Sequence, residues 1–271
     1  MCQVLEVSEN GYYNWSTRGR SKRKRDDEQL AERIEDAYQK NRGNYGSPRI
    51  HAELKEQGIY CGRKRVARLM REKHLHAGRK RRKARTTNSN HRFPIAANLL
   101  KRDFTADAPN KKWVSDITFI ETQEGWLYLS GVLDTYSRKI VGWAMDKHHN
   151  AELVQTALHM ALLGRQPPAG LIHHSDRGSE YASHSYQLLL QENHIQASMS
   201  GTGDCYDNAM MESFWATLKE ECYGQIIFVT RSEAKAAIFE YIEVYYNRKR
   251  MHSSLGYISP VTYEKQGEER K

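Results

Sequence analysis

The first hundred residues carry apolar positions at three- and four-residue spacing, which is typical of helices that bury one face. The spacing predicts helices over 26–40, 48–57 and 62–73, with short helical pieces in 1–17. The third helix pairs an apolar stripe with basic positions: Arg63, Lys64, Arg65, Arg68 and Arg71. A helix, a glycine-containing turn and a basic helix predict a helix-turn-helix-like DNA-binding module. A structural hairpin that only touches phosphates would give the same pattern.

The pattern changes at residue 106, where alternating and continuous apolar runs predict strands. The predicted strands are 113–121, 126–134, 139–145, 171–174 and 195–200. The predicted helices are 151–163, 179–193 and 206–222. Three strands followed by alternating helices and strands predict an α/β domain, a mixed five-stranded sheet with flanking helices. This is the element order of the ribonuclease-H-like fold.

Composition narrows the class of protein. The chain has 271 residues, a mean hydropathy of −0.81 and no apolar run of the roughly 20 residues that span a bilayer. Its first residues lack the basic stretch of a signal peptide. Four scattered cysteines without a CxxC pair indicate neither a disulfide framework nor a zinc knuckle. We therefore expect no membrane partner and a reducing, cytoplasmic location.

Charge is distributed unevenly along the chain. Residues 1–105 hold 26 Lys and Arg against 12 Asp and Glu, whereas 106–271 hold 16 against 21. A basic N-terminal part predicts a polyanionic partner, most often nucleic acid, although a solvated basic segment is the alternative. The densest basic run begins at Arg79, Lys80, Arg81 and Arg82, and we expect it to follow a DNA backbone.

Together these patterns predict five segments. They are an N-terminal helical segment with a basic linker (1–25), a helix-turn-helix-like domain (26–78), a second basic linker (79–105), a catalytic core (106–225) and a C-terminal helical tail (226–271).

Three acidic residues of the second half are candidates for chemistry. Asp116 lies in the middle of a predicted strand, where an ionised carboxylate is costly unless it is paired or binds a metal. Asp176 directly follows the strand 171–174, and Glu212 lies on the helix 206–222. Each has an ordinary alternative: a salt bridge, a turn residue or a surface charge. In a ribonuclease-H-like sheet the first and fourth strands are neighbours, so the three together predict a site for two divalent ions. Oxygen ligands favour Mg²⁺ or Mn²⁺.

Other polar residues near these carboxylates are candidates for DNA contact. Asn208 and Lys219 share a helical stripe with Glu212, and helix-surface polarity is the alternative role for both. Arg177 and His174 are weaker candidates beside Asp176. We expect Trp215, on the same stripe, to pack rather than to stack on a base. The C-terminal group Arg248, Lys249, Arg250 and His252 could bind DNA or fix the tail to the core.

The spacing of 35 residues between Asp176 and Glu212 resembles the DDE signature of retroviral integrases and bacterial transposases. The chain is most similar to the orfB product of bacterial insertion sequences of family three. The matching blocks are Tyr45–Ile50, Val66–Glu72, Trp113–Thr118, His174–Ser179, Asp207–Ala209, Glu212–Trp215, Leu218–Lys219, Tyr246–Asn247, Arg250, His252–Tyr257 and Ser259–Pro260.

The resemblance implies an integrase catalytic core that cuts and joins double-stranded DNA, namely transposon ends and target. Asp116, Asp176 and Glu212 are then its catalytic, metal-binding residues, with two Mg²⁺ or Mn²⁺ ions. It also implies self-association on DNA, an orfA-type upstream partner or fusion, and a nucleoid-associated place in a bacterium. Two departures stand out. Loop 200–204 lacks the basic pair of many relatives, and His51, His74, His76 and His91 lack the cysteine pair of a zinc module, so we expect no zinc.

Three other functions fit parts of the pattern. A structure-selective nuclease of the same fold would cut DNA without joining it. A non-catalytic regulator would use only the helix-turn-helix-like region. A decayed transposase copy would fold without activity. The intact set of three carboxylates favours a transposase over the last two.

Overall fold

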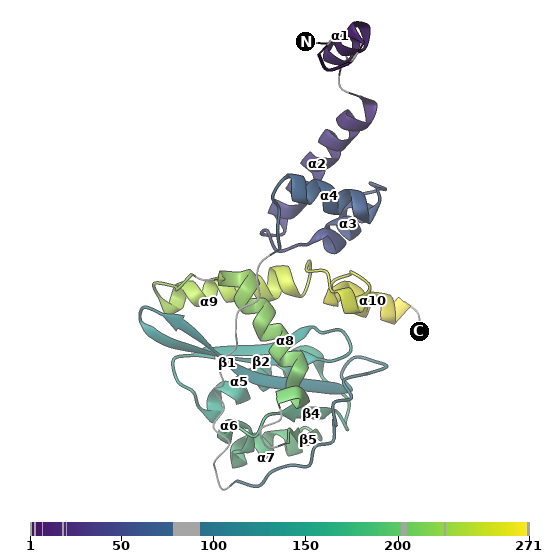
Figure 1. Cartoon of the computed structure of the whole chain (residues 1–271). Helices are drawn as coiled ribbons and strands as arrows, with labels where there is room; N and C mark the ends of the chain where they lie inside the picture. The colour runs from purple at the N-terminus through teal and green to yellow at the C-terminus, as the bar shows by residue number, and fades with distance from the viewer. Residues whose placement is uncertain are drawn as a thin grey trace. The chain divides into compact units, whose positions relative to one another are not determined.

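A computed structural model describes residues 2, 4–6, 8–17, 19, 21–77, 93–201, 205–224 and 226–269. The chain forms two compact units, Met1–Ala77 and Gly78–Lys271 (Figure 1). The predicted DNA contacts Arg79, Lys80, Arg81 and Arg82 lie outside the described residues. No helix in the described ranges combines the length and the apolar character that a membrane span requires.

The first unit is helical, as predicted, with α1 (Glu9–Thr17), α2 (Lys22–Lys40), α3 (Ser47–Glu56) and α4 (Arg63–Glu72). Its core consists of the apolar stripes of the last three helices: Leu30, Ile34, Ile50, Leu54, Val66, Leu69 and Met70. Helix α2 begins four residues before the predicted start. The Ser21 side chain accepts a hydrogen bond from the Lys24 amide (3.2 Å), and this cap satisfies a backbone donor at the helix start.

The second unit contains the predicted mixed sheet of five strands. They are β1 (Lys112–Thr122), β2 (Gly125–Asp134), β3 (Ile140–Asp146), β4 (Ile172–Ser175) and β5 (Gln196–Met199). Their order is β3-β2-β1-β4-β5 (Figure 1). The first three strands pair antiparallel, whereas β4 is parallel to both β1 and β5. Strand β1 is therefore central, and the end of β4 comes beside it.

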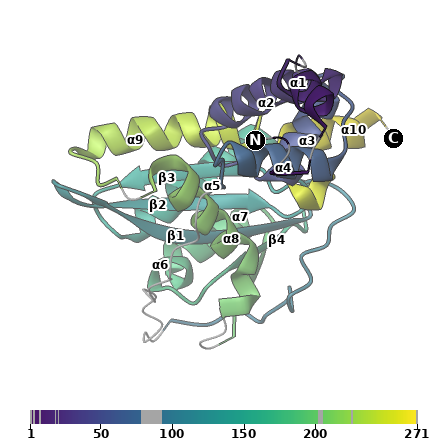
Figure 2. The same cartoon turned by 45° about the horizontal axis from the view of Figure 1, so that its top comes forward.

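Helices cover both faces of the sheet. One core joins the sheet to α5 (Ala151–Arg165), α6 (Ser179–Ala182) and α7 (His184–Glu192). The other joins it to α8 (Ala209–Leu218) and α9 (Arg231–Phe239), and α8 crosses the sheet in Figure 1 and Figure 2. The single helix predicted over 179–193 is wrong. It breaks at Ser183, whose hydroxyl accepts from the Tyr186 amide and caps α7.

The helix predicted over 206–222 is also divided. A 3-10 turn (Cys205–Asn208) precedes α8 and a π-helical turn (Lys219–Tyr223) follows it. The chain then continues through α9, a second π-helical segment (Glu240–Tyr246) and α10 (Pro260–Glu269). The second π-helical segment buries four residues, of which Tyr241, Tyr245 and Tyr246 are aromatic. The C-terminal segment thus completes the core on the α8 face.

Two of the four polar residues of the C-terminal group fix the tail. Arg250 is buried and binds both carboxylate oxygens of Glu221 at 2.7 Å, and His252 is buried beside it. Tyr241 donates to the same Glu221 (2.9 Å). Arg248 and Lys249 are exposed. Arg250 and His252 therefore fix the tail to the core, which was one of the two roles predicted for this group. DNA contact, the other role, stays a prediction for the exposed Arg248 and Lys249.

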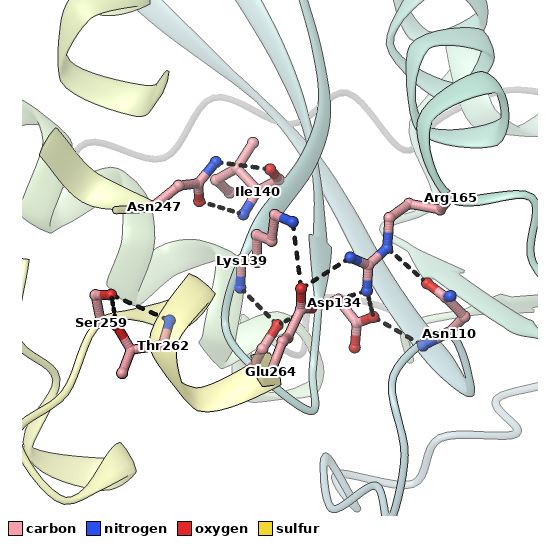
Figure 3. Close-up of polar contacts among 10 residues, drawn as sticks. Asn110, Asp134, Lys139, Ile140, Arg165, Asn247, Ser259, Thr262 and Glu264 are labelled. Carbon is pink, nitrogen blue, oxygen red and sulfur yellow. Dashed lines mark hydrogen bonds and ion pairs between the residues drawn. The ribbon is translucent and has the colours of Figure 1, made fainter. Parts of the chain in front are cut away.

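Polar contacts also join α10 to the far edge of the sheet (Figure 3). Glu264 on α10 binds Arg165 on α5 (2.8 and 2.9 Å), and Arg165 reaches Asp134 at the end of β2 (3.2 Å). The side-chain amide of Asn247 pairs with both backbone groups of Ile140 on β3. These contacts cover part of an edge strand, which would otherwise present unpaired backbone groups.

Candidate active site

Asp116 lies in β1 with two hydrogen-bond donors on its carboxylate. The Ile117 amide donates to Oδ1 (2.9 Å), and the indole N–H of Trp215 on α8 donates to Oδ2 (3.1 Å). Gly131 stands opposite Asp116 on β2, and a methyl group there would lie 2.9 Å from the Trp215 ring. The absence of a side chain at position 131 therefore lets α8 approach the sheet and lets Trp215 reach the carboxylate.

Asp176 lies beside Asp116 because β1 and β4 run parallel. The β1–β4 pairing ends at Val114 and His174, and Asp176 follows the last residue of β4, where its charge is near enough to Asp116 to raise the pKa of that carboxyl. Asp176 Oδ1 accepts from the Gly178 amide (2.9 Å), which tightens the turn after β4. Asp176 can therefore stabilise this turn through Oδ1 and still be one of the predicted metal-binding carboxylates.

Glu212 is in the first turn of α8, and the residues before it attach this helix to β1. The Asn208 side-chain N–H donates to the Ser115 carbonyl (2.9 Å), one residue before Asp116. Asp207 accepts from the Gly201 amide (2.8 Å), from Asn98 (2.9 Å) and from Arg102 (3.1 Å). The Asn208 bond thus holds the start of α8 against the strand that carries Asp116, and the Asp207 bonds fix it to the loop after β5 and to the segment before β1.

The charges of Asp176 and Glu212 both act on Asp116. Burial, followed by the negative charge of Asp176 and less strongly that of Glu212, raises the pKa of Asp116 to about 8. The two donors on Asp116 act in the opposite direction. Burial lowers the pKa of Lys219, while the charge of Asp116 opposes that shift, so the predicted phosphate contact lies within electrostatic range of the carboxylates.

The other predicted DNA contacts near the site have internal partners. Asn208 is buried. Its side-chain N–H donates to the Ser115 carbonyl, but its Oδ1 has no hydrogen-bond partner among the described residues. Arg177 donates to the Ser200 carbonyl (2.6 Å). His174 is buried between Ser198 (2.8 Å) and Ser200 (3.1 Å), and burial lowers its pKa to about 4, which keeps it neutral. DNA contact by Asn208, Lys219 and Arg177 stays a prediction.

The basic residues of α4 fall into two groups. Arg65 and Arg68 each bind Asp27 on α2 at 2.6 Å, and Arg68 also binds Glu72 (2.7 Å). The remaining three, Arg63, Lys64 and Arg71, are exposed. The periodicity of α4 could not separate these groups, because the partner Asp27 lies in another helix.

The donor set suits a hard divalent cation, since it consists of carboxylates that repel one another. In the described part of the chain, no three or more His, Cys, Asp or Glu side chains stand close enough to hold a metal as they are. The sequence missed Trp215 as a hydrogen-bond donor; we expected packing only, and Trp215 does both.

Comparison with known proteins agrees with this architecture. Two families described as "Integrase core domain" match residues 106–205 and 193–260, and one described as "HTH-like domain" matches 24–84. The chain is 50% identical to "Insertion element IS600 uncharacterized 31 kDa protein" of Shigella sonnei, covering 97% of each chain. It is 41% identical to "Transposase InsF for insertion sequence IS3A" of Escherichia coli (strain K12), covering 97% of this chain and 92% of that one.

A solved structure agrees with the fold. A chain of the simian T-cell lymphotropic virus intasome in complex with PP2A regulatory subunit B56 gamma superimposes with a TM-score of 0.50 and 16% identity. The match covers 79% of this chain and 70% of that one. The predicted ribonuclease-H-like integrase core, preceded by a helix-turn-helix-like domain, is confirmed.

Proposed function

The chain belongs to the integrase-core transposases of the IS3 insertion-sequence family, and from this premise we propose that Asp116, Asp176 and Glu212 catalyse its strand cleavage and strand transfer. The function of a DNA transposase follows from the family. The observation that supports this assignment is that the charges of Asp176, just after β4, and of Glu212, on α8, both raise the pKa of Asp116 on the neighbouring strand β1.

The cofactor we propose is two Mg²⁺ or Mn²⁺ ions held by these three carboxylates. The support is chemical: the donors are oxygens only, and Asp116 carries a pKa of about 8 that a nearby cation would lower. Asn208, whose side-chain N–H bonds to the residue before Asp116, has a buried Oδ1 without a hydrogen-bond partner among the described residues, and this oxygen is a further candidate ligand. When bound, such ions activate the attacking oxygen and stabilise the departing one.

The chain's own residues hold the reactants in place. The Ile117 and Trp215 N–H groups fix both oxygens of Asp116. Lys219, with its positive charge near Asp116, binds a phosphate next to the cut. In cleavage, a water oxygen bonds to phosphorus and the 3′-oxygen leaves with a proton. In transfer, that 3′-hydroxyl attacks a target phosphodiester and displaces its 3′-oxygen.

We propose the following partners. Double-stranded DNA, as transposon ends and target, meets the helical unit through the exposed Arg63, Lys64 and Arg71 of α4. Two chains assemble on DNA, since two ends must be joined to one target, and an orfA-type partner or upstream fusion contributes recognition of the ends. The complex works on the bacterial nucleoid.

A Mg²⁺-dependent strand-transfer assay on oligonucleotides tests the proposal with Glu212→Gln. Loss of a carboxylate that binds metal should lower the rate at least ~100-fold. Glu192→Gln, an exposed carboxylate at the end of α7, is the matched control and should keep full activity. Retained transfer in Glu212→Gln would refute the assignment. Cutting without joining would favour the nuclease, and DNA binding indifferent to Glu212→Gln without any cutting would favour the regulator or a decayed copy.

A further inference from the structure

Four aromatic rings meet on the hairpin that joins β1 to β2 and on the loop before α5. The centroid of the Phe119 ring lies 5.2 Å from that of Tyr128 and 6.4 Å from that of Trp126, and both pairs of rings meet nearly edge to face. His149 lies 5.5 Å from Phe119 and stacks on Tyr128 at 5.3 Å. We call these four residues the aromatic platform.

The platform is accessible. Trp126 is 51% exposed and the His149 side chain is 33% exposed, while Phe119 and Tyr128 are half-buried. The Tyr128 hydroxyl makes no hydrogen bond to any described residue, so it is available to a ligand. Clustered exposed rings leave apolar surface in water, which marks a binding surface when they are contiguous.

The aromatic platform adjoins the three carboxylates. His149 Nδ1 lies 3.6 Å from Glu180 Oε1. A methyl group on Gly178 would lie 3.0 Å from both Glu180 Oε2 and Asp176 Oδ1, so these two side chains flank the same glycine. Phe119 follows Asp116 by three residues, so the two side chains lie on opposite faces of β1, and the aromatic platform approaches the carboxylates through His149 and Glu180, beside the turn that carries Asp176.

The charge around the platform selects the part of DNA that fits. Glu180 lies beside His149, and Glu121 and Glu124 are exposed on the same hairpin. Carboxylates repel phosphate and so disfavour the DNA backbone here, although the Arg231 guanidinium donates to the Trp126 carbonyl on the same hairpin (3.0 Å). A base is uncharged and offers a flat face that stacks on aromatic rings whatever its sequence.

We propose that the aromatic platform binds a nucleobase of the DNA strand held at Asp116, Asp176 and Glu212, and this inference rests on the proposed function of those residues. The base is unpaired, because a base inside a duplex has both faces covered. Stacking on the exposed Trp126 ring, with Phe119 meeting the base edge to face and the Tyr128 hydroxyl as a polar contact, holds the strand end apart from its complement. The strand thereby enters the site in one direction.

Fluorescence of 2-aminopurine tests the proposal in the full-length chain. The probe is a short single-stranded oligonucleotide with 2-aminopurine near its 3′ end, titrated in buffer with EDTA so that no catalysis occurs. The wild-type chain should quench the probe on binding. Trp126→Leu should lose the quenching and bind about tenfold more weakly. Trp126→Tyr, which keeps a ring, should restore both, and Phe239→Leu, an equally exposed ring on α9, should match the wild type.

Three outcomes would overturn the proposal: binding by the wild type without quenching, full quenching in Trp126→Leu, or equal losses in Phe239→Leu. A change of oligomeric state in Trp126→Leu with unchanged quenching would assign the platform to a second copy of the chain. Glu212→Gln separates the two proposals. It should quench like the wild type while losing strand transfer. Retained transfer would refute only the catalytic assignment, and absent wild-type quenching only the platform.

Discussion

The ionisation of Asp116 is determined by opposing effects of its neighbours. Burial and two neighbouring carboxylates disfavour its ionised form, and two N–H donors favour it. The family blocks around Asp116, Asp176 and Glu212 could be recognised in the sequence because each is a short local pattern. The Trp215 bond to Asp116 could not, because the two residues are 99 positions apart and meet only through the folding of α8 onto β1.

Trp215→Phe keeps the buried ring and removes the indole donor. Loss of a hydrogen bond to the charged form raises the pKa of Asp116, so a higher pH is needed to ionise it. We expect the acidic limb of the pH–rate profile for strand transfer to move up by about one pH unit. Trp143→Phe, which loses an indole bond to Glu243 (2.8 Å), is the control. The same shift in both variants would show a general effect of losing an indole.

Without divalent metal, Asp116 should make the fold less stable as the pH rises. Its folded pKa of about 8 lies above the ordinary 3.8, so between these values the folded chain holds one proton more than the unfolded chain. Asp116→Asn cannot ionise. In EDTA near pH 8 it should unfold at a higher temperature than the wild type, because its free energy of unfolding is larger by on the order of 1–3 kcal/mol.

The difference should close near pH 4, where both forms are neutral in the folded chain. Asp107→Asn, an exposed aspartate of the same unit, serves as control and should leave the melting curve unchanged at both pH values. A lower melting temperature for Asp116→Asn at pH 8 would contradict the raised pKa. Mg²⁺ should stabilise the wild type more than the variant.

At the scale of elements, the apolar patterns predicted most helices and strands, because each pattern is local: it repeats every three or four positions in a helix and every two in a strand. The partner of each polar side chain, in contrast, depends on how the helices pack against one another. In α4, Arg65 and Arg68 look like Arg63 and Arg71 in the sequence, yet Asp27 on α2 binds both of the first pair. These hydrogen bonds, first from Arg68 and then from Arg65, lower the pKa of Asp27.

Asp27→Asn should free the Arg65 guanidinium for DNA and loosen that of Arg68, which keeps its ion pair with Glu72 (2.7 Å). Each added phosphate contact releases counterions, so the binding constant should fall more steeply with salt, by a slope of about 0.9 per contact. The measurement is a salt titration of duplex binding by fluorescence anisotropy. Asp26→Asn, an exposed neighbour that makes the same change of charge, is the control. Equal slopes in the two variants would show that Arg65 and Arg68 do not reach DNA.

At the scale of the molecule, the C-terminal segment belongs physically to the catalytic unit. Its aromatic residues share the core of α8, β1 and β2, and α10 is fixed by Glu264 to Arg165, to Lys139 (3.2 Å) and to Ser137 (2.8 Å), as Figure 3 shows in part. The helical region of this tail was predicted, whereas its role in the core was not, because the contacts join positions about a hundred residues apart.

Glu264→Gln should therefore destabilise the catalytic unit. It leaves Arg165 buried with less compensation, and breaking a buried ion pair costs about 3 kcal/mol. Denaturant unfolding followed by tryptophan fluorescence measures the loss. Glu268→Gln, exposed on the same helix, should be neutral. Equal stability of the two variants would mean that α10 adds little to the fold.

The sequence by itself determined the elements, the basic first half and the three acidic residues, because each is encoded in short-range periodicity or in a local block. Tertiary structure alone decided which polar groups remain free. It paired Arg65 and Arg68 with Asp27, buried Arg250 on Glu221, brought Asp176 at the end of β4 near Asp116 on β1 and gathered the aromatic platform. The physical reason is that hydrogen bonds, ion pairs and pKa shifts depend on separations of a few ångströms, and folding creates these between residues distant in the chain.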